Sequence, residues 1–161
     1  MALPGVWALL TSLRECLCNE IEASGRKVCF CAIVPGQQAI FEYAQGGQAW
    51  VRLANVFPSN DFPAPAGTEA KCYSPMAWQI EVGIARCVPV VNGQQSPPTA
   101  EQQTYAAEVQ AADMELMRRA IACCVASDDD YSYLLGQYTP LGPVGDIVSG
   151  SWTLLVQKGD D

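Results

Sequence analysis

Residues 74–91 constrain the fold more than any other part of the 161-residue sequence. Read at every second position, large apolar side chains occupy one face and small or polar side chains occupy the other. The apolar set is Trp78, Ile80, Val82 and Ile84, and the second set is Ala77, Gln79, Glu81, Gly83 and Ala85. A period of two over this length is typical of a long, half-buried β-strand. We therefore predict a central strand whose apolar face packs against helices, and whose other face meets solvent, another subunit or a lumen.

Two segments predict helices. From about Pro4 to Ala23, apolar residues recur at steps of three and four, and Gly25 suits the left-handed position just past the helix end. The second helix opens at Thr99, which matches a capping box together with Gln102, and it runs to about residue 125. Its expected apolar stripe consists of Tyr105, Val109, Ala112, Leu116, Ala120 and Cys123.

The remaining segments predict strands and loops. Residues 26–34, 48–57 and 147–158 read as strands, and residues 131–140 read as a helical turn that continues as a strand. Residues 141–146 are rich in turn-forming residues. Residues 58–74 contain several prolines and small polar residues, which predicts a long loop that serves as a contact arm or as a disordered connector.

The order of these elements indicates the fold class. A helix, three strands, a long helix and one or two final strands are expected to form an α+β domain. Its sheet should be mainly antiparallel, with about four to five strands, and the N-terminal helix and the long helix should pack on it. The length and the absence of an internal repeat indicate a single domain over residues 1–161.

Charge and composition argue against catalysis. The chain has 9 basic and 17 acidic residues, a net charge of −8 and no histidine. Without histidine, the chain holds no Ser–His or Cys–His nucleophile system, and its glycines form no phosphate-binding loop. Glu81 is a lone carboxylate on the central strand, and we expect a structural pairing with Arg52 or Arg86. We predict no enzyme activity, no cofactor and no metal site.

Two charged clusters have a structural interpretation that we favour over a binding role. Arg118 and Arg119 lie near the end of the long helix, where cations complement the helix dipole and form salt bridges more often than they bind phosphate. Asp128, Asp129 and Asp130 lack the alternating spacing of a calcium loop. We expect them to form a solvated acidic loop.

Eight cysteines are distributed over the chain, at positions 16, 18, 29, 31, 72, 87, 123 and 124. The two C-x-C pairs are spaced more closely than the pairs of structural zinc sites usually are. Cys16 and Cys18 would also point to different sides of the first helix. We favour buried thiols that act as small apolar side chains, with disulfides and a zinc site as alternatives.

The N-terminal residues are apolar but carry no basic residue of the kind that opens a signal peptide, and Arg14 and Glu15 soon interrupt them. The sequence also has no apolar run near the roughly 20 residues that span a bilayer. We therefore expect a protein that is made in a cytoplasm and stays there, without a membrane anchor.

Four segments resemble one family of viral proteins. These are MAWQIEVGIARC at residues 76–87, AADMELMRRAIACC at 111–124, GQYTPLGPVGD at 136–146 and GSW at 150–152. In this order, and with these elements around them, they resemble the tail terminator and neck proteins of long-tailed bacteriophages. The resemblance is closest to head-to-tail connector proteins of phages that infect actinobacteria, and it covers most of the chain.

The resemblance implies a structural protein of the virion, in the neck of a siphovirus, assembled in the host cytoplasm. Such proteins form a homo-oligomeric, usually hexameric, ring at the head-proximal end of the tail. The ring ends tail-tube growth, joins the tail tube protein to the head-side connector or stopper, and lets DNA pass through its lumen without specific binding. No catalytic, cofactor or metal residues carry over, because the family has none.

Several residues are candidates for these roles. Residues 58–74 and 138–147 are the expected subunit contacts. Some of the acids are expected to line or flank the channel, the loop residues more than the helix residues. The candidates are Asp61, Glu69, Asp113, Glu115, Asp128, Asp129 and Asp130. The main alternative is a non-catalytic adaptor or binding module of a bacterium or phage, which a monomeric state would favour. A small secreted disulfide-rich binding protein is a third possibility, favoured by the cysteine count.

Overall fold

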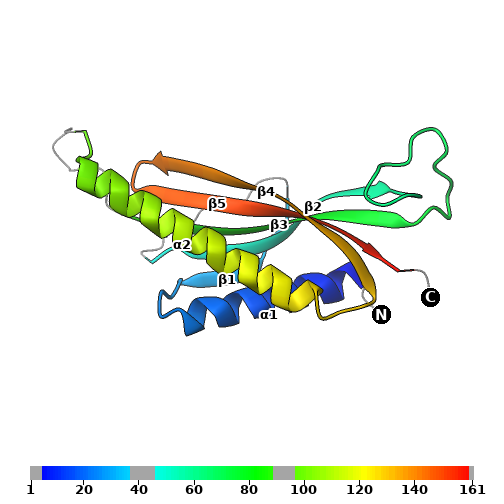
Figure 1. The fold of residues 1–161 in the computed structure, drawn as a ribbon, viewed down its shortest axis with the longest axis horizontal. Helices are drawn as coiled ribbons and strands as arrows, with labels where there is room; N and C mark the ends of the chain where they lie inside the picture. Colours follow the sequence, from blue (N-terminus) through cyan, green and yellow to red (C-terminus); the bar gives the residue numbers. More distant parts are fainter. Residues whose placement is uncertain (1–4, 37–45, 89–96, 160–161) are drawn as a thin grey trace.

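A computed structural model describes residues 5–36, 46–88 and 97–159 of the chain (Figure 1). Its elements follow the predicted order of a helix, three strands, a long helix and two strands. Their bounds are α1 Gly5–Ala23, β1 Phe30–Ile33, β2 Gln48–Pro58, β3 Met76–Cys87, α2 Ala100–Val125, β4 Tyr131–Val144 and β5 Ile147–Lys158. This confirms the α+β fold with an N-terminal helix and one long helix.

The five strands form one sheet in the order β1-β2-β3-β5-β4. The pair β1 and β2 is parallel, and the other three pairs are antiparallel. The strand predicted to be central, β3, does lie in the middle of the sheet. β4 and β5 form a hairpin that turns at Gly145, whose φ of 60° is a conformation that glycine adopts without strain.

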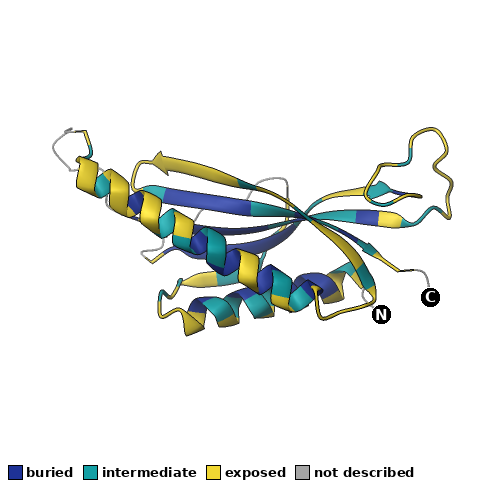
Figure 2. Ribbon diagram, in the orientation of Figure 1, coloured by how far each residue is buried: buried dark blue, intermediate teal, exposed yellow. Residues whose placement is uncertain are grey.

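Both helices cover one face of the sheet, and the buried residues concentrate where helices and sheet meet (Figure 2). The apolar face of β3 lies in this layer, with Ile80, Val82 and Ile84 packed in one cluster with residues of both helices. The predicted orientation of β3 is therefore confirmed. The α1 positions in the same cluster are Leu9, Leu10, Leu13, Leu17 and Ile21.

The start of α2 was predicted correctly, and so was the burial of Leu116 and Ala120, but the two ends of the predicted stripe were not. Thr99 and Gln102 form the capping box. Tyr105 and Cys123, however, are exposed. The buried residues are Ala106, Asp113, Leu116, Met117, Ala120, Ile121 and Val125. The stripe is rotated because it includes Asp113, whose carboxylate is paired inside the protein, whereas the sequence pattern placed this acid on the solvent face.

Two strands differ from their predicted bounds. β1 is confined to Phe30–Ile33, four residues in place of the nine expected. β4 is one strand of 14 residues, without the expected helical turn. It includes residues 141–144 of the segment that was expected to turn, and the chain turns at residues 145–146 of that segment. Shifts in its register against β5 occur between Leu135 and Tyr138 and between Leu141 and Val144, so irregular pairing absorbs the glycines and prolines.

The prediction of buried thiols was wrong. Cys16 is joined to Cys124, and Cys18 to Cys31, with Cα atoms 6.3 and 6.1 Å apart. The two α1 cysteines do point to different sides, one to α2 and one to β1. The other four cysteines are exposed. The described residues contain no group of three or more His, Cys, Asp or Glu side chains placed to hold a metal ion.

Among the described parts of the chain, neither helix is long and apolar enough to cross a membrane.

Candidate assembly surfaces

The face of the sheet opposite the helices is partly closed by its own side chains. Trp50 Nε1 donates a hydrogen bond to Glu81 Oε1 at 2.9 Å, and the Trp50 side chain is buried. Its ring lies where a Cβ at Gly83 would be, which explains the small residue at that position. Arg52 pairs with Glu81 and donates to the carbonyl oxygen of Gly36 at 2.9 Å. The expectation that Glu81 has a structural partner is confirmed, and that partner is Arg52.

A second buried ion pair joins β3 to α2. Arg86 donates to Asp113 through Nε at 2.6 Å and through its terminal amino group at 3.0 Å, and both side chains are buried. Arg86 also donates to the backbone carbonyl of Arg26 at 3.0 Å. Asp113 therefore holds the helix on the sheet and does not line a channel, which corrects that expectation.

The two arginines near the end of α2 make surface ion pairs, as predicted. Arg118 pairs with Glu115 at 2.6 Å, and Arg119 lies 3.8 Å from Glu20 of α1. The hydrogen bond from Arg118 lowers the pKa of Glu115 below its ordinary value. Glu115 is thus an ion-pair partner within the helix surface, not an unpaired acid.

The acidic loop before β4 is exposed and partly organised by its own backbone. Asp128 Oδ1 accepts a hydrogen bond from the backbone N–H of Asp130 at 3.1 Å. Burial raises the pKa of the adjacent Tyr131, and the charge of Asp128 raises it further. These contacts are those of a solvated loop, which is the interpretation that the sequence favoured.

The segment between β2 and β3 forms an arm that projects from the sheet, past the end of the helical layer (Figure 1). Ser59 is fully buried at its base. The Ser59 Oγ donates to the carbonyl oxygen of Ala64 at 2.7 Å, and Gln157 Nε2 on β5 donates to the carbonyl oxygen of Ser59 at 2.8 Å. These bonds favour the contact arm over the disordered connector.

The tip of the arm is exposed. Tyr73 is 74% exposed, and the Lys71 ammonium group lies 5.6 Å from the centre of its ring, which is within range of a cation–π contact. A shallow hollow of about 410 Å³ lies beside them. Its lining is Asn60, Glu69, Lys71, Tyr73 and Ser74. Exposed tyrosine is one of the residue types enriched at protein contact surfaces.

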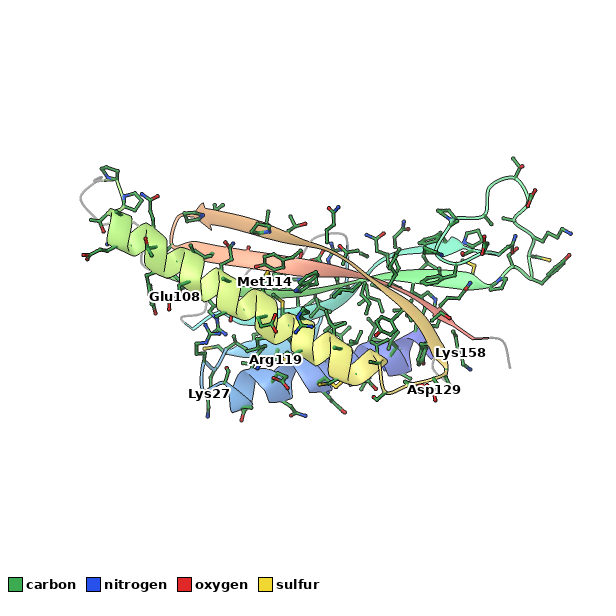
Figure 3. All side chains as sticks on the ribbon, viewed as in Figure 1. Lys27, Glu108, Met114, Arg119, Asp129 and Lys158 are labelled. Carbon is green, nitrogen blue, oxygen red and sulfur yellow. A yellow bond between two sulfur atoms is a disulfide. The ribbon has the colours of Figure 1, made fainter. Side chains whose placement is uncertain are left out.

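β4 is the outermost strand on one side of the sheet, and it has no charged residue over its 14 positions. Its exposed apolar side chains are Tyr133, Leu134, Leu141 and Val144. Monomeric proteins usually protect such an edge with lysines or other charges. Pro140 and Pro143 protect the second half of β4, whereas Tyr131–Leu135 has no proline. The charged residues labelled in Figure 3 lie on α2, on nearby loops and at the end of β5, not on β4.

On the opposite side of the sheet, β1 pairs with β2 only along Gln48–Val51. From Leu53 onwards, the outer edge of β2 has no strand partner among the described residues. An apolar groove of about 490 Å³ lies there between α1 and the two strands. It is lined by Val6, Trp7, Leu10, Ile33, Val34, Pro35, Gly36 and Leu53.

Sequence reasoning singled out the arm and the second half of β4, but it missed the groove and the first half of β4. Trp7 lies outside the apolar stripe of the first helix, and a large apolar residue in that position was the available signal for the groove. The uncharged stretch from Tyr131 to Val144 was the signal for the edge.

The sequence matches no model of a known protein family, and comparison with curated proteins finds no match. The function is therefore inferred from the surfaces described above and from the resemblance of four segments to tail terminator and neck proteins of long-tailed phages. These segments are residues 76–87, 111–124, 136–146 and 150–152.

Proposed function

We propose that this chain is a structural virion protein of the neck of a long-tailed phage. It forms a ring at the head-proximal end of the tail, ends growth of the tail tube, and joins the tail to the head-side connector while DNA passes through. Two independent lines support this proposal. One is the resemblance to tail terminator and neck proteins, and the other is the presence of surfaces suited to assembly.

The observation that carries the proposal is the uncharged outer edge of β4. Each chain has a net charge of −8, so copies of it repel one another unless they meet through surfaces without acidic residues. β4 offers 14 residues without a charge, and the groove beside α1 has an apolar lining. Closed rings require two different surfaces on each subunit, and this chain has two.

The arm supplies a third surface that neither edge of the sheet uses. It projects beyond the helical layer, and its tip exposes Tyr73 beside Lys71 and Glu69 (Figure 1). A ring between head and tail has to contact other proteins above and below as well as its own neighbours. The arm is suited to contact the head-side connector or the tail tube protein.

The exposed acids are compatible with a DNA conduit. Asp61 and Glu69 lie on the arm, and Asp128, Asp129 and Asp130 lie on the loop before β4, all of them exposed. Acidic walls repel a duplex, so it passes without being held. Screening limits this repulsion to about 8 Å at physiological salt, so only acids close to the lumen contribute.

The test is the assembly state of the purified chain and its effect on tail tubes. We expect a ring with a central opening by electron microscopy, a matching mass by light scattering, and tail tubes that stop growing when the ring is added. A variant that lacks residues 60–73 should still form the ring but should lose binding to one axial partner. A chain that stays monomeric even with tail tube protein and head-side connector present would contradict the proposal.

The acidic residues provide a second readout on the same ring. Replacing Asp61 and Glu69 by lysine should leave folding nearly unchanged, because exposed substitutions usually cost little. If these acids flank the lumen, the variant ring should retain duplex DNA at low salt and release it as salt rises, whereas the wild-type ring should not retain it. Tight DNA binding with a steep salt dependence by the wild-type ring would contradict the conduit role.

The adaptor alternative is favoured by one observation, the exposed tip of the arm. A monomer that binds a partner through Tyr73 and Lys71 would present the same surface. Under that alternative, removing residues 60–73 abolishes all binding, and the groove and the β4 edge have no role in assembly.

A further inference from the structure

We infer that Gln157 on β5 positions the arm, the segment between β2 and β3, so that its exposed tip meets a partner protein in one fixed direction. This inference rests on the proposed function, in which the arm contacts the head-side connector or the tail tube protein. It adds how the arm is held, and it names a residue outside the arm on which binding at the tip depends.

The arm leaves the sheet through two strands, and a third strand holds it. β2 and β3 extend past the helical layer as a two-stranded ribbon (Figure 1). Such ribbons twist more than wider sheets and have little stability of their own. Gln157 Nε2 donates a hydrogen bond to the carbonyl oxygen of Ser59 at 2.8 Å, and Gln157 belongs to β5. An attachment to a third strand limits the twisting of the ribbon and so fixes the direction of the arm.

Ser59 is the fixed point at the base of the arm. It is fully buried although it is polar. Its backbone N–H donates to the carbonyl oxygen of Pro75 at 2.8 Å, and its Oγ donates to that of Ala64 at 2.7 Å. Its own carbonyl oxygen accepts from Gln157. Because a buried polar group without a partner destabilises the fold, these three bonds keep both ends of the arm and β5 together.

The rest of the arm keeps its shape through its own bonds. The Ala66 N–H donates to the carbonyl oxygen of Pro58 at 2.7 Å. At the tip, the Ser74 N–H donates to the Lys71 carbonyl oxygen and the Lys71 N–H donates to Ser74 Oγ, both at 2.9 Å. Tyr73 lies inside this turn and is 74% exposed. A tip that is already ordered loses little conformational entropy on binding, so its affinity depends on where the base directs it.

Association kinetics test the positioning role. Gln157→Glu keeps the length of the side chain but removes the N–H donor and places a carboxylate against the Ser59 carbonyl oxygen. We expect the free arm of this variant to have the binding-competent direction only about one tenth of the time, so the association rate constant should fall about tenfold. The dissociation rate constant should stay the same, because the bound arm makes the same contacts. Tyr73→Ala removes a contact at the tip, so it should instead raise the dissociation rate constant.

The rate constants are measured by surface plasmon resonance on the immobilised ring, with tail tube protein and head-side connector injected separately. Gln157→Lys is the rescue variant, because its ammonium group again donates to Ser59, and it should recover most of the association rate. Gln103→Glu on α2 is the matched control. It makes the same replacement in an exposed side chain whose amide donates to the carbonyl oxygen of Pro98 at 3.2 Å, and it should bind like the wild type.

Digestion with trypsin separates positioning from folding of the arm. Lys71 at the tip is the only lysine or arginine between Arg52 and Arg86. The turn around Lys71 does not involve Gln157, so cleavage after Lys71 should occur at the same rate in the wild type and in Gln157→Glu. Much faster cleavage of the variant would show that its arm has unfolded, and Gln157 would then be a structural residue and not a positioning one.

The outcomes that overturn the inference differ from those that overturn the proposed function. Unchanged association by a folded Gln157→Glu chain, or a change only in its dissociation rate constant, overturns the inference while the neck proposal stands. If circular dichroism shows that this variant does not fold, Gln157→Met removes the donor without adding a charge and gives the same test. A wild-type ring that binds neither partner contradicts the proposed function itself.

Discussion

The helical layer packs on the sheet and the arm extends from two of its strands, and the two regions are held in place by different interactions. Under the helices, β3 contributes side chains that are almost fully buried, an ion pair reaches from Arg86 to Asp113, and two disulfides attach α1 to its neighbours. In the arm, hydrogen bonds hold the base around Ser59 and continue towards the tip, and most residues after Ser59 are exposed. The difference indicates that one part carries stability and the other is available for contacts.

The largest expected effect concerns the buried ion pair of the helical layer. Asp113→Ala leaves the Arg86 guanidinium buried without its carboxylate partner, which should cost about 3–5 kcal/mol of unfolding free energy. Glu115→Ala, two residues along the same helix, removes a solvent-exposed partner of Arg118 and should cost far less, because surface ion pairs contribute little to stability. Chemical denaturation of both variants measures the two values. Equal costs would show that the Arg86 pair does not support the layer as described.

Two substitutions within the sheet test directly whether stability comes from the helical layer and not from the arm. Ile80→Ala opens a cavity beneath the helices and should cost about 2–5 kcal/mol. Val56→Ala, on the neighbouring strand at the base of the arm, removes a side chain that is 41% exposed, and it should cost much less. Thermal or urea unfolding gives both numbers. A large loss of unfolding free energy in the Val56→Ala variant would mean that the base of the arm belongs to the stabilising core.

The disulfides should contribute the next largest amount. Cys16–Cys124 closes a long loop, with a sequence separation of 108, and reduction of such a bridge typically costs about 2–4 kcal/mol. We expect the fold to survive reduction, because the core beneath the helices is continuous without the bridges. Unfolding measured with and without reductant, and with a chelator as control, gives the contribution. Complete unfolding on reduction would show that the core alone is insufficient.

These bridges also bear on where the protein functions. Disulfides persist in oxidising surroundings and are rare in a reducing cytoplasm. A virion protein experiences both environments, because it is assembled in the host and then released. The four remaining exposed cysteines give no further constraint on this point.

The sequence predicted those helices and strands that are specified by a local pattern of neighbouring residues. In β3, the alternation of large and small residues predicted the strand and the face that packs beneath the helices. It did not predict that Ala77, Gly83 and Ala85 on the other face are buried as well. The capping box at Thr99 is equally local, and it correctly gave the start of α2. Local signals of this kind need no knowledge of distant residues.

The sequence predictions were wrong where the structure of a residue depends on a partner that is distant in sequence. Asp113 is buried only because Arg86 lies opposite, so the helix alone could not reveal its buried face. Cys16 and Cys124 are far apart in sequence, and no spacing rule pairs them. β4 extends through its turn-forming residues because β5 pairs with it on both sides of the irregular positions. The groove beside Trp7 likewise exists only because β1 is short.

The smallest expected effect lies at Tyr138, where the layer meets the β4 edge. Its ring packs on Trp152, with ring centroids 5.6 Å apart, but its hydroxyl is buried without a hydrogen-bond partner in the described structure. Tyr138→Phe keeps the ring and removes the unsatisfied hydroxyl, so the change in stability at neutral pH should be near zero or slightly stabilising. Tyr138→Ala, the control, loses the ring and should destabilise at every pH.

At alkaline pH, the stability of the wild type should differ from that of the Tyr138→Phe variant. Burial, and to a smaller extent the charge of Asp113, raises the pKa of Tyr138 to about 12, above the value of about 10 in an unfolded chain. The folded state therefore favours the neutral phenol. Its contribution to stability is complete below pH 10 and is lost as the pH rises through about 12. The phenylalanine variant has no phenol to ionise, so the stability of the wild type should fall relative to it over this interval. Urea unfolding at a series of pH values measures the difference between the two proteins. If the difference in unfolding free energy between the two proteins stays constant up to pH 12, the phenol is solvated in the folded state. Tyr138 would then belong to the exposed edge of β4 and not to the buried layer.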